Sequence, residues 1–185
     1  MFIQTLDTPN PNSMKFVFED PAYNNDSTAT YTMENTTTQF AKDIFETHGV
    51  SGLYITKDFI TITKIESENW DIIKPQILHV LLEYLVQSKP LLDTVGGSTE
   101  NRTDLSNLSE IDKQIVDLIE ERVRPAVAMD GGDIEFVKYD QESGIVYLRM
   151  HGACSGCPSS SATLQNGVKR MLQHYIPEIY DVASV

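Results

Sequence analysis

The only two cysteines of the chain lie close together, in the segment Cys154-Ser155-Gly156-Cys157. A thiolate binds soft metals and attacks disulfide bonds, so this spacing is compatible with metal binding and with dithiol redox chemistry. The redox interpretation prefers a pair that follows a strand of a βαβ unit. This pair follows a sequence typical of a β-hairpin. That context favours redox chemistry less, but leaves it open.

The residues around the pair favour ionised thiols and room for a bulky ligand. Cys157 directly precedes Pro158 and the expected start of a helix, where unpaired N–H groups stabilise a thiolate. Gly152 and Gly156 relieve crowding where the backbone must fold around an inorganic group. We therefore expect Cys157 to ionise readily.

The number of thiols limits what the pair can hold. Iron–sulfur clusters and structural zinc ions usually take about four protein ligands, whereas one chain supplies two thiols. A cluster bound by this pair would have to be shared by two chains, in a symmetric four-cysteine site. Such a site opens when the chains separate, which suits a carrier better than a permanent electron-transfer centre. The ligand count alone does not distinguish [4Fe-4S] from [2Fe-2S] or zinc.

The elements that must position the cysteines form the second half of the chain, residues 109–185. Ser109 is an expected N-cap, and an apolar stripe from Ile111 to Val123 predicts a helix that Pro125 ends or bends. The hydrophobic pattern then predicts strands over 134–139 and 145–150, a helix over about 159–174, and a strand within 179–185. The order α-β-β-α-β implies a small sheet covered by two helices.

The first half, residues 1–88, also reads as a small α+β domain. Its pattern predicts strands over 14–19, 53–56 and 59–65, and helices over 37–47 and 70–86. Residues 89–108 contain the small, polar, aperiodic segment Gly96-Gly97-Ser98 and predict a flexible linker. The expected fold is therefore two small α+β domains joined by a flexible linker.

Both halves are acidic, within a net charge of −13. Residues 1–88 carry 5 Lys and Arg against 12 Asp and Glu, and residues 109–185 carry 7 against 12. Such a field repels a phosphate backbone, so we expect no nucleic-acid partner. No run reaches the roughly 18–20 apolar residues that cross a bilayer, and we expect no membrane partner. The N-terminus has neither a secretory signal nor an Arg-rich transit peptide, which predicts a cytosolic protein or the mature form of an organelle protein.

Three other sets of residues have less specific interpretations. Asp130 and Asp133 flank Gly131-Gly132, which predicts a turn with capping carboxylates in place of a hard-metal site. His151 is expected to end a strand with its ring partly exposed. The remaining set is expected to fill the cores; it consists of Met14, Met129, Met150 and Met171.

The motifs together resemble a known family. Over about residues 109–181 the chain resembles the C-terminal domain of NifU, through Asp130-Gly131-Gly132-Asp133, two strands, Gly152-Ala153-Cys154-Ser155-Gly156-Cys157-Pro158-Ser159-Ser160 and Thr163-Leu164. The first half resembles the N-terminal domain of Nfu proteins, through Thr8-Pro9-Asn10-Pro11-Asn12 followed by Lys15-Phe16. The order of the domains looks like a mitochondrial-type Nfu protein without its transit peptide.

This resemblance implies a non-enzymatic carrier with no catalytic residues. Cys154 and Cys157 would hold a [4Fe-4S] cluster between two subunits, with [2Fe-2S] and zinc as alternatives. The cluster-bound form would be a homodimer or higher oligomer, and its partners would be client apoproteins, typically lipoyl synthase, and iron–sulfur assembly factors. The location would be the cytoplasm of a bacterium or the mitochondrial matrix. The first domain is expected to dock partners, and the second alone to bind the cluster.

Overall fold

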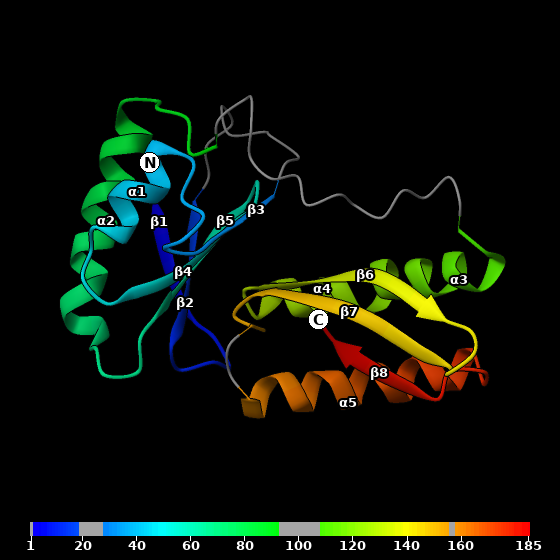
Figure 1. Cartoon of the computed structure of the whole chain (residues 1–185). Helices are drawn as coiled ribbons and strands as arrows, with labels where there is room; N and C mark the ends of the chain where they lie inside the picture. The colour runs from blue at the N-terminus through cyan, green and yellow to red at the C-terminus, as the bar shows by residue number, and fades with distance from the viewer. Residues whose placement is uncertain (1, 19–27, 93–107, 156–157) are drawn as a thin grey trace. The chain divides into compact units, whose positions relative to one another are not determined.

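The computed structural model describes residues 2–18, 28–92, 108–155 and 158–185 (Figure 1). The chain divides into two compact units, Met1–Glu100 and Asn101–Val185, and each is described by itself. Each unit mixes helices with a β-sheet, which confirms the predicted α+β class. Within the described ranges, every helix is too short or too polar to traverse a lipid bilayer.

The first unit contains a five-stranded antiparallel sheet in the order β1-β2-β5-β4-β3. Apolar residues meet across neighbouring strands, as where Phe16 pairs with Ile60 and Leu53 pairs with Ile62. Such cross-strand pairs give the sheet one continuous apolar face. The strands are β1 (Ile3–Asp7), β2 (Ser13–Phe18), β3 (Ala29–Tyr31), β4 (Val50–Ile55) and β5 (Phe59–Lys64). Of these, β1 and β3 were not predicted.

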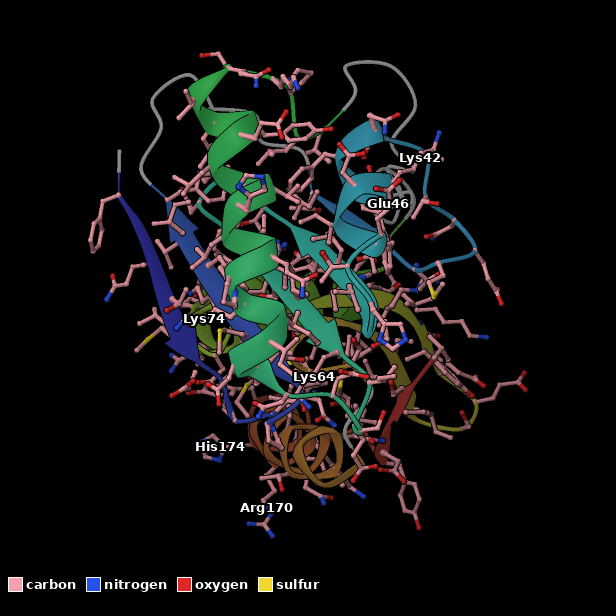
Figure 2. The ribbon with its side chains drawn as sticks, turned by 90° about the vertical axis from the view of Figure 1, so that its left-hand side faces the viewer. Lys42, Glu46, Lys64, Lys74, Arg170 and His174 are labelled. Atoms are coloured by element: carbon pink, nitrogen blue, oxygen red, sulfur yellow. The ribbon has the colours of Figure 1, made fainter. Side chains whose placement is uncertain are left out.

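Two helices, α1 (Gln39–Phe45) and α2 (Trp70–Val86), lie across the same face of this sheet (Figure 2). Each begins at a capped residue, because Thr38 Oγ1 accepts from Ala41 N and Asn69 Oδ1 accepts from Asp71 N. The apolar stripe of α2 is buried against the sheet, as the interval of four predicted. Fully burying an apolar side chain of this size stabilises a fold by about 1.5–3 kcal/mol. The helix residues with no exposure are Phe40, Ala41, Ile44, Ile73, Ile77 and Leu81.

Hydrogen bonds fix the Thr8-Pro9-Asn10-Pro11-Asn12 segment between β1 and β2. Asn12 N donates to Asn10 Oδ1 at 3.0 Å, and Lys64 Nζ donates to Asn12 Oδ1 at 3.0 Å. Trp70 Nε1 donates to Pro11 O at 3.0 Å. The segment is thus held by the end of β5, where Figure 2 labels Lys64, and by the start of α2.

The expected linker, 89–108, begins inside the first unit's core. Leu91 is fully buried and Leu92 is 7% exposed, both within this core. Residues 93–107 lie outside the described ranges. The division into residues 1–88, 89–108 and 109–185 therefore stays a prediction.

The second unit has the predicted order α-β-β-α-β. Its sheet runs β6-β7-β8, with β6 antiparallel to β7 and β8 parallel to β7. Alternate residues of β6 and β7 face a core that the helices close, including Ile134, Leu148 and Leu172. The elements are α3 (Glu110–Leu118), η3 (Ile119–Val123), α4 (Arg124–Met129), β6 (Gly132–Asp140), β7 (Ile145–Gly152), α5 (Pro158–Tyr175) and β8 (Asp181–Ser184).

The opening helix of this unit changes its hydrogen bonding before Pro125. Ser109 and Asp112 form a capping box at the start of α3, as expected for an N-cap. The segment η3 is a π-helix, in which Arg124 N donates to Ile119 O five residues earlier. The wider turn accommodates a proline ring that would collide with an ordinary helical turn. Of the two alternatives predicted for Pro125, an end of the helix is wrong, because α4 continues to Met129, and the irregularity is the π-helical turn directly before the proline.

Candidate metal-binding site at Cys154

Cys154 lies in a tight turn that follows β7, where residues 152–155 form what we call the cysteine loop. Cys154 N donates to His151 O at 3.4 Å, and Ser155 Oγ donates to Gly152 O at 2.8 Å. Gly152 has a φ of 62°, a left-handed conformation that favours glycine. Cys157 lies outside the described residues, so the joint use of both thiols stays a prediction.

The Cys154 side chain is buried, with 8% of its surface exposed, and it belongs to the apolar core of the second unit. Burial, reinforced by the negative charges of Asp130 and Asp133, raises the pKa of the Cys154 thiol to about 12. The side chain is therefore protonated at neutral pH. A metal must displace this proton when it binds, because the thiolate is the ligand.

Gly132, the first residue of β6, lies directly against the sulfur. A Cβ atom added to Gly132 would be 2.3 Å from Cys154 Sγ and 3.0 Å from His151 O. Only glycine fits at this position without movement of its neighbours. The register of β6 and β7 pairs Gly132 with Gly152, and Ala153 N donates to Gly131 O at 3.1 Å. The Asp130-Gly131-Gly132-Asp133 segment thus forms one wall of the Cys154 environment.

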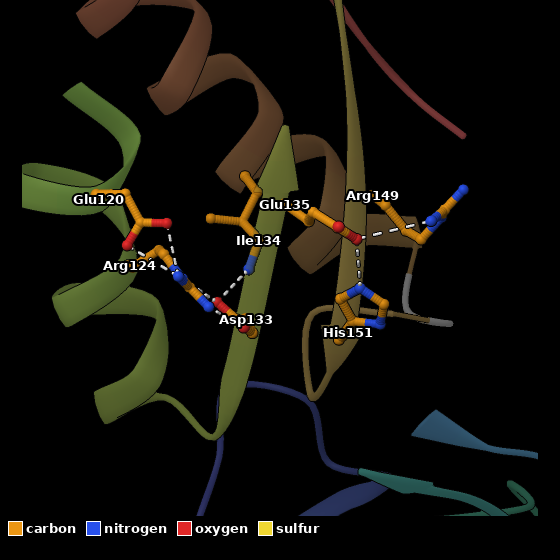
Figure 3. Close-up of polar contacts among 7 residues, drawn as sticks. All are labelled: Glu120, Arg124, Asp133, Ile134, Glu135, Arg149 and His151. Atoms are coloured by element: carbon orange, nitrogen blue, oxygen red, sulfur yellow. Dashed lines mark hydrogen bonds and ion pairs between the residues drawn. The ribbon is translucent and has the colours of Figure 1, made fainter. Parts of the chain in front are cut away.

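An ion pair holds the start of β6 to the preceding helix (Figure 3). Arg124 Nε and Nη2 donate to Asp133 Oδ1 and Oδ2 at 2.8 and 2.7 Å. Arg124 Nη1 donates to Glu120 Oε1 at 2.6 Å, and Asp133 Oδ1 also accepts from Ile134 N at 2.8 Å. The hydrogen bonds to Asp133 raise the pKa of the Arg124 guanidinium. Asp133 therefore pairs with an arginine, and it also accepts a hydrogen bond from the backbone, that of Ile134 N.

A second polar group lies on β6 and β7 beside the cysteine loop. Glu135 Oε2 is 3.5 Å from His151 Nε2 and 3.6 Å from Arg149 Nη1 (Figure 3). His151 occupies β7 near its end, as predicted, and its side chain is 12% exposed. Among the residues that the structure describes, no three His, Cys, Asp or Glu side chains form a group able to hold a metal ion.

One methionine departs from the sequence prediction. Met14 and Met150 are buried, with 6% and 8% exposure, and Met171 packs partly buried against the core. Met129 is 78% exposed at the end of α4, so the prediction that it fills the core is wrong. Val127, two residues earlier, takes the buried position of this helix.

Two contributors to the site, Gly132 and Arg124, were not predicted from the sequence. The signal for Gly132 was the glycine doublet between two carboxylates, for which only a turn was predicted. A second glycine beyond what a turn requires indicates a close approach of another group. Arg124 gave no comparable signal, because its contact with Asp133 depends on the turn of the helix before it.

Comparison with known proteins agrees with this architecture. The family model for the NifU-like domain matches residues 115–183, and the model for the scaffold protein Nfu/NifU N-terminal domain matches residues 3–88. NifU-like protein 5, mitochondrial, of Arabidopsis thaliana is 42% identical over 98% of this chain and 67% of its own length. The NFU1 iron-sulfur cluster scaffold homolog, mitochondrial, of Drosophila sechellia is 42% identical over 100% of this chain and 65% of its own length.

A solved structure also aligns with part of the chain. The solution structure of a NifU-like protein from Saccharomyces cerevisiae covers 50% of this chain and 85% of that chain, with 28% identity and a TM-score of 0.38. This chain spans about two thirds of the length of the relatives named above. The matches to both domain models, in this order, and 42% identity across almost the whole chain place it in a family. The chain belongs to the Nfu family, with an Nfu N-terminal domain followed by a NifU-like domain.

Proposed function

We propose that this protein is a carrier, not an enzyme, which binds a [4Fe-4S] cluster between two copies and transfers it to client apoproteins. The observation that carries the proposal is the thiol count: one chain supplies two cysteines, and a cluster takes about four protein ligands. Cys154 and Cys157 of each copy would provide the four thiolates. The names of the relatives, which include an iron–sulfur cluster scaffold, support a cluster as the cargo.

The surroundings of Cys154 are consistent with a cluster that is held and then released. Binding requires the thiol to lose its proton, and this loss costs free energy because burial raises the pKa of the thiol. On transfer, a client thiol would give its proton to Cys154 as its own sulfur takes over the bond to iron. One Fe–S bond forms as another breaks, with no change in oxidation state. The high pKa of Cys154 favours this proton uptake.

Anaerobic reconstitution followed by gel filtration with light scattering tests the proposal. We expect the cluster-bound form to elute with the mass of two chains or more, and to contain four iron and four sulfide ions per pair of chains. Reconstituted Cys154→Ser and Cys157→Ser variants should carry almost no cluster. A full cluster on a single chain would refute the shared site, and two iron ions per pair would replace [4Fe-4S] with [2Fe-2S].

Two other functions give different results in simple assays. A dithiol oxidoreductase would reduce insulin disulfides without metal, whereas we expect only background activity. Burial and a pKa of about 12 make Cys154 a poor resting nucleophile, so in this alternative Cys157 would be the attacking thiol. A structural zinc dimer would be colourless, whereas an iron–sulfur cluster absorbs broadly in the visible range.

The partners and location follow from the same proposal. We infer that clients and assembly factors dock on the first domain, and that a chain starting near Leu105 still binds the cluster. Loss of cluster binding in that shorter chain would refute this division of labour. The mitochondrial names of the relatives favour the mitochondrial matrix. The alternative is the cytoplasm of a bacterium.

A further inference from the structure

The first two residues of β6 each make one specific contact. Gly132 lies against Cys154 Sγ, and Asp133 receives the paired hydrogen bonds of Arg124. Because these residues are adjacent in the chain, a displacement of Asp133 also displaces Gly132. The side chain of Arg124 therefore helps to fix the position of the Gly132 backbone, which lies against the sulfur.

The contact of Arg124 with Asp133 is of the strongest kind available to side chains. Two parallel, charge-assisted bonds fix both the distance and the orientation of the carboxylate. The side chains are 26% and 14% exposed, so water competes weakly for them. The bond from Ile134 N attaches the same carboxylate to the strand, and Glu120 holds the other side of the guanidinium. Arg124 thus joins η3, α4 and β6 (Figure 3).

Gly132 limits access to one side of the sulfur. Cys154 Sγ lies 2.3 Å from the place that a Cβ on Gly132 would take, and Cys154 belongs to the apolar core cluster of the second unit. An iron ion bonded to Sγ requires more room than a methyl group. A metal that binds on this side of Sγ therefore requires Gly132 and Cys154 to separate.

We propose that Arg124 is a positioning residue for Cys154. By holding Asp133, it keeps Gly132 against the sulfur, and a cluster that binds on this side of Cys154 requires the contact to open. The inference rests on the proposed function for the identity of the metal group. The accessibility of the thiol does not depend on it, so the two can fail separately.

Thiol alkylation in the full chain tests this role. With Cys157→Ser as the background, Cys154 is the one remaining thiol, and mass spectrometry gives its rate of reaction with iodoacetamide. We expect Arg124→Gln to accelerate the reaction roughly tenfold or more, because a contact of this strength limits local opening. Electrostatics alone predicts the opposite sign, because removal of a positive charge near the thiol makes the thiolate harder to form.

A matched control lies in the same domain. Lys169 on α5 pairs with Asp181 on β8 at 2.9 Å, and the two side chains are 31% and 47% exposed. Asp181→Asn removes this ion pair without a change at β6, and should leave the alkylation rate within roughly twofold of the background. Urea unfolding of each variant gives the stability against which the rates are compared. An Arg124→Gln rate no higher than that of Asp181→Asn would overturn the proposal.

Two further variants keep the test decisive if Arg124→Gln does not fold. Arg124→Lys keeps the charge but cannot form the paired bonds, so its rate should lie above the background. Gly132→Ala inserts a methyl group where Sγ now lies and should also expose the thiol. Its control is Gly167→Ala, because a Cβ at Gly167 has no atom within 4 Å. Unchanged rates in both Arg124→Lys and Gly132→Ala would refute the role of the β6 contact.

Cluster retention provides a second readout in the chain with both cysteines. If the buried position of the Cys154 side chain competes with cluster binding, a substitution that makes the exposed position more frequent strengthens cluster binding by the same factor. We expect reconstituted Arg124→Gln to keep its cluster roughly tenfold longer than the parent against a chelator. Faster loss than the parent would contradict the proposal. If no variant binds a cluster, the proposed function fails and the alkylation result still decides the role of Arg124.

Discussion

The two units of this protein use their interiors differently. The first has a core of closely packed apolar residues around a five-stranded sheet, in which Phe16, Phe40 and Ile44 have no exposure. The second includes a cysteine in its core and places a glycine against it. The second unit therefore buries a group that can bind a metal once it loses its proton, whereas the core residues named for the first unit have no such chemistry.

The substitution Cys154→Ser should affect the two units most differently, because it removes a cluster ligand from the second unit and leaves the first unchanged. We expect it to reduce the cluster content of reconstituted protein to near zero, because a hydroxyl does not replace a thiolate as a ligand for iron. Iron and sulfide analysis gives the cluster content. Urea unfolding followed by Trp70 fluorescence should be unchanged, because the single tryptophan belongs to the first unit. A shift in that transition would mean that the units are not independent.

A cavity in the core of the first unit should destabilise that unit and leave cluster binding unchanged. Leu81 is fully buried, so we expect Leu81→Ala to lower the free energy of unfolding of this unit by about 2–5 kcal/mol. Trp70 fluorescence during urea unfolding measures the loss. Iron per chain after reconstitution should equal that of the parent at a temperature where the first unit stays folded. A proportional loss of iron would show that the cluster site depends on the first unit.

The pH dependence of the second unit should reflect Cys154. Its folded pKa is about 12, against 9.0 for an ordinary cysteine. Between these values the unfolded chain loses the proton and the folded chain keeps it. The stabilising contribution is therefore complete below pH 9 and falls as the pH rises toward 12.

Alkylation measures this difference directly. In the Cys157→Ser background at pH 9, the folded chain should react with iodoacetamide roughly tenfold or more slowly than the chain unfolded in urea. Equal rates would show that Cys154 is exposed and ionised in solution. That result would also remove the distinction between the two cores.

The smallest effect concerns a feature that the units share, their capped helices. Ser109 Oγ accepts from Asp112 N at 3.2 Å in the second unit, and Thr38 Oγ1 accepts from Ala41 N at 3.1 Å in the first. Ser109→Ala and Thr38→Ala should each cost about 1 kcal/mol of unfolding free energy. Calorimetry of the two variants measures the costs. Because a helix cap acts locally, each substitution should leave the unfolding temperature of the other unit unchanged.

Much of the fold was predictable from local patterns. The apolar interval of four predicted α2 over Trp70–Val86, and the alternation of residues predicted β6 and β7 to within two residues at each end. Such patterns record which face of an element is buried, and that information is local. The strand β3 escaped prediction because three residues are too few to establish an alternation, and β1 did because its apolar residues Ile3 and Leu6 are three apart instead of two.

The site was predictable only in part. The paired cysteines identified its location, because their chemistry is evident from residue type and spacing. The contact of Gly132 with Cys154 was not, because it depends on the register of β6 and β7 and on the direction of one side chain. The ion pair of Arg124 with Asp133 likewise depends on how a helix packs on a sheet. Contacts between elements follow from tertiary packing, which no single segment encodes.

The π-helix before Pro125 has a consequence for the length of this segment. In an α-helix each residue turns the chain by about 100°. A π-helical turn contains one residue more than an α-helical turn, so deleting one residue from Ile119–Val123 would restore the α-helical turn with little rotation of the residues on either side. The ring of Pro125 would then meet an ordinary turn and collide with the carbonyl group four residues earlier. The extra residue therefore makes room for the proline, and its loss should destabilise the helix that carries Arg124.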